Sequence, residues 1–205
     1  IMSSDWSSDV CSSDLENIQS IFEEGASQAG ETMGMMIGQK LEIRVNRVVE
    51  VPFQDLYEGL YPPDTPLAMI VVRITGQNSG YILFLMFEEN AKKLNELLWN
   101  EISFEDGVVN LSNISALKEL ANVVGSCFLN TLANRVGIEL RPTEPIALYD
   151  MLAAVLEGLI VEQSLVSDKA ILIDTNMAEQ QKGIGVHFLF LPSPGLVDSI
   201  ANGLN

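Results

Sequence analysis

The sequence predicts an α+β domain built as a tandem repeat, in which a pseudo-twofold axis relates two halves and two long helices cover an antiparallel sheet. Three observations carry this prediction. A helical pattern recurs 95 residues further along the chain, each half contains a pair of apolar strands, and only a short stretch of mixed character, 100–111, separates the halves. With 205 residues, 47% of them hydrophobic, the chain can bury the core of one domain.

The first fifteen residues are set aside. Ser-Ser-Asp occurs three times in 1–15, without apolar periodicity or the features of a signal peptide. The stretch resembles the in-frame translation of a sequencing adapter, and we treat it as an artefact; a genuine leader rich in Ser and Asp is the alternative. The domain then spans 16–205, with repeat one at about 16–100 and repeat two at about 112–205.

The clearest helical pattern lies in the second half. Apolar side chains recur there every three or four residues, which is typical of an amphipathic helix. Ninety-five positions earlier, five of six residues are again apolar, so residues 16–37 form the matching helix. Gly38 and Gly137 stand where the two helices end. The six positions of the second-half stripe are Ile114, Leu117, Ala121, Val124, Phe128 and Leu132.

Each long helix is followed by an extended segment and then by a strand pair joined through a polar turn. Such hairpins imply antiparallel pairing, and we expect the two hairpins side by side in one sheet. A short helix ends each half, and a linking helix lies before the hairpin, shorter in the first half. The predicted strands are 41–51, 67–74, 80–87, 138–141, 170–174 and 185–191, and the predicted short helices are near 53–60, 88–99, 146–162 and 194–204.

Composition excludes several classes of function. The chain has 28 Asp and Glu residues against 11 Lys and Arg, a net charge of −17, and nucleic-acid binding needs clustered basic residues. No apolar run approaches the roughly 18 residues of a membrane span, so we expect no membrane insertion. Without the leader, Cys127 is the one remaining cysteine, which fits a reducing cytoplasmic compartment.

Few side chains offer chemistry of their own. The single histidine, His187, falls within an apolar strand, and no Cys/His set is present for zinc or a thiol nucleophile. We therefore expect no metal site and no resident cofactor. Gly30, Gly34 and Gly38 recur at every fourth residue, a spacing that predicts close helix packing.

One polar helix face is the remaining candidate site. Ser115, Glu119 and Asn122 are spaced by four and three residues, which puts them on one face of the second long helix. The first half carries Ser20 and Glu24 at equivalent positions, but Ser27 where the asparagine would be. An ordinary solvated helix face is the alternative explanation.

Pro145 follows Asn122 after twenty-two residues. The pattern Ser115-x3-Glu119-x2-Asn122-x22-Pro145 resembles the signature of the CheC/CheX/FliY phosphatases of chemotaxis, which belong to two-component signalling. The repeat covers 16–205, and a two-repeat chain without a further domain is similar to the CheC type. The resemblance implies a hydrolase that removes the phosphoryl group from the phosphoaspartate of a CheY-type response regulator.

The resemblance also implies roles for single residues. Asn122 would orient the attacking water, and Glu119 would engage the active-site lysine of the partner. Ser115 and Pro145 would be structural, at the helix start and in a rigid loop. The phosphorylated partner would carry the Mg²⁺, and the receptor deamidase CheD is a further implied partner.

The first half departs from this signature. Ser27 lacks an amide, and Pro52 follows it after twenty-four residues instead of twenty-two. We therefore interpret Ser20, Glu24 and Ser27 as a degenerate first site. A non-catalytic adaptor that binds a receiver domain, CheD or the flagellar switch is the alternative function. A third interpretation is an unrelated helix–sheet domain in which the motif occurs by chance.

Overall fold

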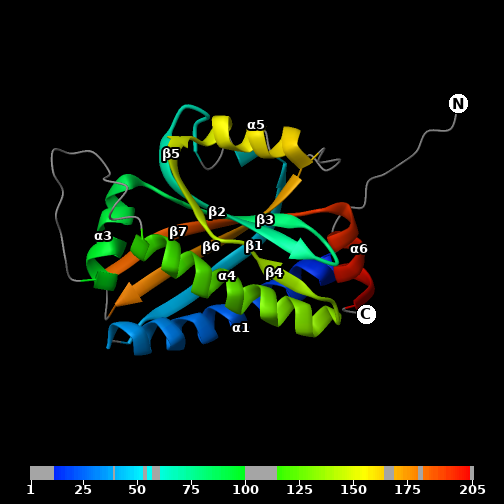
Figure 1. Ribbon diagram of the computed structural model, residues 1–205, viewed down its shortest axis with the longest axis horizontal. Helices are drawn as coiled ribbons and strands as arrows, with labels where there is room; N and C mark the ends of the chain where they lie inside the picture. The colour runs from blue at the N-terminus through cyan, green and yellow to red at the C-terminus, as the bar shows by residue number, and fades with distance from the viewer. Residues whose placement is uncertain are drawn as a thin grey trace, which may run out of the picture.

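The computed structural model describes residues 12–38, 40–52, 55–56, 61–99, 115–163, 169–179 and 182–203 (Figure 1). Its helices are α1 (Ser12–Ile37), α3 (Glu88–Trp99), α4 (Ser115–Val136), α5 (Leu152–Gln163) and α6 (Pro194–Gly203). Its strands are β1 (Glu42–Pro52), β2 (Pro66–Gly76), β3 (Gly80–Met86), β4 (Leu140–Pro142), β5 (Ile146–Met151), β6 (Lys169–Glu179) and β7 (Lys182–Pro192).

The seven strands form one antiparallel sheet in the order β1-β6-β7-β3-β2-β4, and β5 pairs with β2 beside β4. The two hairpins lie side by side through the pairing of β3 with β7. The first strand of each half then crosses to the other half's hairpin, since β1 pairs with β6 while β4 and β5 pair with β2. This palindromic order confirms the predicted fold class.

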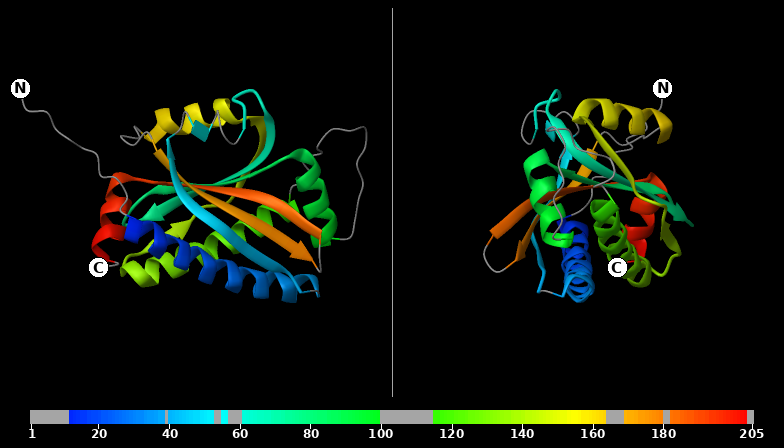
Figure 2. Two further views of the ribbon diagram at one scale, coloured as in Figure 1. Left: turned by 180° about the vertical axis from the view of Figure 1, so that it is seen from behind. Right: turned by 60° about the vertical axis from the view of Figure 1, so that its left-hand side comes forward.

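The sheet separates two hydrophobic clusters. On one face, α1 and α4 run antiparallel and side by side, with α3 and α6 at the ends of that layer, whereas α5 covers the other face (Figures 1 and 2). Alternate side chains of each strand point to opposite faces. Phe188 and Phe190 of β7 accordingly pack beneath the long helices, and Leu189 and Leu191 pack toward α5.

The two long helices approach each other at an aromatic pair. The rings of Phe22 and Phe128 stack with their centroids 3.6 Å apart. A Cβ atom on Gly25 would lie 3.0 Å from the Phe128 Cα atom, so the absence of a side chain there permits the close approach. The prediction that Gly30 serves this purpose is wrong, because a Cβ on Gly30 would instead meet the Leu41 carbonyl oxygen at 2.9 Å.

The helices end where glycine was predicted to end them. Gly38 and Gly137 follow α1 and α4 directly, with φ angles of 69° and 75° that favour glycine. Helix α1 begins at Ser12 and not at residue 16, so the last part of the stretch set aside is helical. Leu15 packs against the core one turn before Ile18, which extends the apolar stripe.

The predicted helix over 146–162 is wrong in its first third. Residues Ile146–Met151 form β5, and the helix begins only at Leu152. Main-chain pairing with β2, from Val71–Ile146 to Pro66–Met151, decides the conformation of this segment. The predicted helix near 53–60 and the stretch 100–111 fall largely or wholly outside the described residues.

Strand β6 extends to Glu179, beyond its predicted end at Asp174. Within the described ranges, no helix has the length and apolar character needed to cross a bilayer.

Candidate functional site

The outward face of α4 carries the candidate residues. Ala116, Leu117, Leu120 and Ala121 are buried beneath the helix, and this turns the remaining positions of its first two turns toward solvent. Ser115 and Asn122 are exposed and Glu119 is half-buried, all along one side of the helix. The structure therefore brings Ser115, Glu119 and Asn122 together on an accessible surface.

Pro145 is buried at a break in the sheet edge. It lies in the short connection between β4 and β5, both of which pair with β2. The Thr143 amide donates to the Arg73 carbonyl at 2.9 Å, which holds this connection against β2. Pro145 is thus a fixed point of the sheet edge and not a surface residue.

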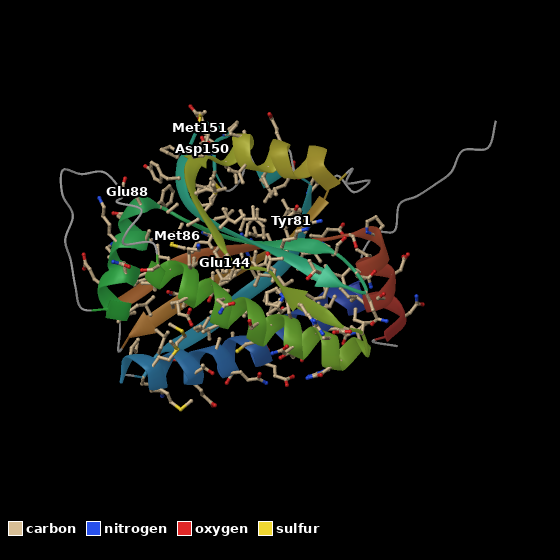
Figure 3. The ribbon with its side chains drawn as sticks, viewed as in Figure 1. Tyr81, Met86, Glu88, Glu144, Asp150 and Met151 are labelled. Atoms are coloured by element: carbon tan, nitrogen blue, oxygen red, sulfur yellow. The ribbon has the colours of Figure 1, made fainter. Side chains whose placement is uncertain are left out.

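A second contact ties this connection to the candidate helix. The Lys118 ammonium lies 3.3 Å from Glu144 Oε1, so the residue beside Glu119 is bonded to the residue beside Pro145. Figure 3 shows Glu144 beside the N-terminal half of α4. The two ends of the predicted motif are therefore neighbours in space, although twenty-two residues separate Asn122 from Pro145.

Glu119 and Asn122 keep their polar atoms available. Among the described residues, neither side chain takes part in a hydrogen bond or an ion pair. No group of three or more His, Cys, Asp or Glu side chains in the same ranges is arranged to hold a metal ion. What this face offers is one carboxylate and one amide, which together accept and donate hydrogen bonds to a partner or to water.

On the equivalent face of α1, the glutamate has an ion-pair partner. Ser20, Glu24 and Ser27 are exposed along it. Glu24 is not available, because Arg135 Nη2 donates to Glu24 Oε2 at 2.9 Å. Sequence reasoning did not find Arg135, which lies 111 positions from its partner in the chain.

Pro52 does not take the place of Pro145. It ends β1, whereas the irregularity that matches the β4–β5 break is a register shift between Val45 and Arg47. Strands β1 and β4–β5 occupy equivalent sheet edges, and in the first half no proline stands at the break. The first half therefore lacks both the asparagine and the proline of the motif.

The remaining ionisable groups of interest lie on the opposite face of the sheet. His187 and its cross-strand neighbour Asp174 point toward the α5 side, with His187 Nδ1 3.5 Å from Asp174 Oδ1. Burial lowers the pKa of His187 and outweighs the opposing effect of the Asp174 carboxylate. Burial raises the pKa of the neighbouring Tyr61 phenol as well. These groups cannot reach the outward face of α4.

Cys127 is half-buried on α4. Burial raises the pKa of its thiol, which keeps the group protonated and poorly nucleophilic. Cys127 therefore adds no covalent chemistry to the face formed by Glu119 and Asn122.

The amino-acid sequence is similar to that of a characterised protein. No protein-family model matches the chain. The chain is 28% identical over 182 residues to the CheY-P phosphatase CheC of Bacillus subtilis (strain 168), and the match covers 87% of each protein. The chain is therefore similar in sequence and in fold to proteins of the CheC/CheX/FliY family. The resemblance stated from the Ser115–Pro145 motif is thereby confirmed.

Solved structures share the fold of this CheC-like chain. FliY of Thermotoga maritima superposes with a TM-score of 0.73 at 15% identity, over 95% of this chain and 96% of that one. The FliM middle domain of H. pylori gives a TM-score of 0.67 at 14% identity, over 95% and 98%. CheX of Borrelia burgdorferi, solved in a complex with CheY, BeF3 and Mg²⁺, gives 0.53 at 15% identity, over 85% and 96%.

Proposed function

We propose that this CheC-like chain is a protein aspartyl-phosphate phosphatase that acts on a CheY-type response regulator. The observation that carries the proposal is the pair of half-buried Glu119 and exposed Asn122 on α4, neither of them bonded to another described residue, on a helix tied through Lys118 and Glu144 to buried Pro145. Its relative in Bacillus subtilis is a CheY-P phosphatase. We propose the cytoplasm as the compartment and CheD as a further partner.

Asn122 would position the nucleophilic water. Its side-chain oxygen can accept one water hydrogen while its NH₂ group donates to another oxygen, so the amide can fix both the place and the direction of the water. The water oxygen attacks phosphorus, the bond from phosphorus to the aspartyl oxygen breaks, and inorganic phosphate leaves. The partner recovers its free carboxylate. A glutamine orients the attacking water of small GTPases in the same manner.

Glu119 would hold the partner in register. A carboxylate one turn before Asn122 can accept a charge-assisted hydrogen bond from the partner's active-site lysine. The partner would supply the Mg²⁺ that balances the charge of the phosphoryl group, so α4 needs to contribute no metal ligand. Ser115 would start the helix, and Pro145 would set the height of its first turns above the sheet edge.

The test is the decay of a phosphorylated, Mg²⁺-loaded CheY-type receiver in the presence of the full chain. We expect the wild type to accelerate decay and Asn122→Ala to lose that acceleration, since alanine cannot orient water. Asn130→Ala is the matched control, because Asn130 is an exposed asparagine two turns further along the same helix. Equal acceleration by the wild type and Asn122→Ala would overturn the assignment of Asn122.

A second function is favoured by the structural likeness to FliY and the FliM middle domain. In that case the chain would be an adaptor that binds a receiver or a switch component without hydrolysis. Receiver binding by both the wild type and Asn122→Ala, with unchanged decay of the phosphorylated form, would select the adaptor.

A further inference from the structure

The two long helices differ in length at one end. At the spacing of 95 residues, Ile37 at the end of α1 corresponds to Leu132 of α4. Helix α4 continues for one more turn, to Val136, before Gly137 ends it. This extra turn, 133–136, has no counterpart in the first half, where Gly38 already ends the helix.

The extra turn carries an arginine onto the first-half face. Because α1 and α4 run antiparallel and pack through Phe22 and Phe128, the end of α4 lies over the first turns of α1 (Figure 2). The Arg135 side chain bonds from there to Glu24, near the middle of α1, at 2.9 Å, and the two side chains are 47% and 44% exposed. The pair is accessible to solvent and to a partner.

Among the residues that the structure describes, no cation pairs with Glu119 on the second-half face. Helix α1 ends one turn too early to supply one, and the adjacent Lys118 is bonded to Glu144. The two faces therefore differ in local charge. Glu119 presents a free carboxylate, whereas at Glu24 the carboxylate is already satisfied and a guanidinium stands beside it.

We propose that Arg135 closes the face formed by Ser20, Glu24 and Ser27 to the receiver, so that each chain engages one receiver, through Glu119 and Asn122. This inference rests on the proposed function. The receiver site would present a lysine and Mg²⁺, both cationic. Arg135 occupies the Glu24 carboxylate, which is the equivalent of Glu119, and it repels the cations of the incoming site.

Removing the arginine should expose a second docking face without restoring catalysis there. Ser27 has a hydroxyl in place of the amide and cannot fix water from two directions. The expected result for Arg135→Gln is therefore a second bound receiver with no gain in phosphate release per chain. A purely structural role for Arg135 would change neither stoichiometry nor salt dependence.

The experiment is titration calorimetry of the full chain with a CheY-type receiver held in its phosphorylated form by beryllofluoride and Mg²⁺. We expect one receiver per chain for the wild type and two for Arg135→Gln. Arg141→Gln is the matched control and should stay at one, because Arg141 is an exposed arginine paired with Glu139 away from α1. Glu24→Gln combined with Arg135→Gln should return to one.

The outcomes separate the inference from the proposed function. No binding by the wild type would overturn both. One receiver for the wild type and still one for a folded Arg135→Gln variant would overturn the inference alone. Two receivers for the wild type would also overturn it, since Arg135 would then not close the face.

Discussion

An asparagine and a serine occupy equivalent positions on the two long helices, and the chemistry proposed for the two halves differs at these residues. Both side chains are exposed on the outward surface. The amide of Asn122 has a donor and an acceptor fixed in one plane, whereas the Ser27 hydroxyl is shorter and rotates freely. Under the proposed function, the amide of Asn122 is the group that would let the second-half surface orient water, and Ser27 could not replace it.

Asn122→Ser tests this distinction directly, because it gives the second half the residue of the first. We expect the acceleration of receiver dephosphorylation to fall by about 10²-fold, typical of losing one positioned hydrogen-bonding group. The rate of phosphate release measures it, with Asn130→Ser as the control. Retention of more than half of the wild-type rate would contradict the role given to the amide.

His187 predicts how stability depends on pH. Since burial lowers the pKa of His187 in the folded state, the unfolded chain binds the proton more tightly. Stability should therefore be full above the unfolded pKa, about 6.5, and should decrease as pH falls from there toward the lower folded pKa. His187→Phe, which removes the only histidine, should weaken this dependence.

Urea unfolding at pH 7.5 and pH 5.5 compares the two proteins. The drop in unfolding midpoint between these pH values should be smaller for His187→Phe than for the wild type. An equal drop would show that other groups cause the pH dependence.

At the scale of elements, the contact between α1 and α4 depends on which glycine faces the neighbour. Gly25 lies against the backbone of Phe128, whereas a Cβ on Gly125 would have nothing within 4 Å. Two glycines in equivalent helices therefore have different consequences. One permits helix packing, and the other only lowers helix propensity.

Gly25→Val should lower the free energy of unfolding by about 1–3 kcal/mol, the usual cost of overpacking a tight contact. Gly125→Ala should raise it by about 0.5–1 kcal/mol, because alanine is the better helix former. Thermal or urea unfolding of both variants measures whether each substitution raises or lowers the free energy of unfolding. A stabilising Gly25→Val would show that the helices can move apart without cost.

Local patterns predicted the elements that bury a regular stripe. The 3.6-residue period located α1 and α4, and the apolar strands of the hairpins were visible as blocks. Strand β5 was mistaken for helix because it is an edge strand with exposed Ile146, Leu148 and Met151, so its side chains show no clean alternation of burial. Its conformation depends on β2, about 80 positions earlier in the chain.

The candidate site, too, has one part that the sequence predicts and another part that it does not. The shared face of Ser115, Glu119 and Asn122 follows from spacing on one helix. The contact of Lys118 with Glu144 and that of Arg135 with Glu24 join distant segments, and no local pattern contains them.

At the scale of the whole molecule, each half completes the sheet of the other. The hairpin β6–β7 has β1 of the first half at its outer edge, and β2–β3 has β4 and β5 of the second half. Separating the halves would break the pairing of β1 with β6, of β3 with β7, and of β2 with β4 and β5, and it would expose both hydrophobic clusters. The stability of each half therefore depends on the presence of the other half.

Neither half should fold alone. Fragments divided between residues 106 and 107 should each lack cooperative unfolding, and mixing them should restore native circular dichroism, since the mixture again contains every strand pairing. Thermal unfolding of the separate and mixed fragments measures this. A cooperative transition in one isolated half would contradict the interdependence.

The exchanged edge strands also constrain what a duplicated gene can afterwards lose. In most duplications a copy without a task can be deleted, but here deletion of either copy would remove an edge strand that the survivor needs. Side chains on the surface of the first half can be replaced one at a time. Its backbone has to stay, because β1 pairs with β6 of the second half. The palindromic sheet thus permits the two halves to differ in function and would preserve a copy that has no catalytic site.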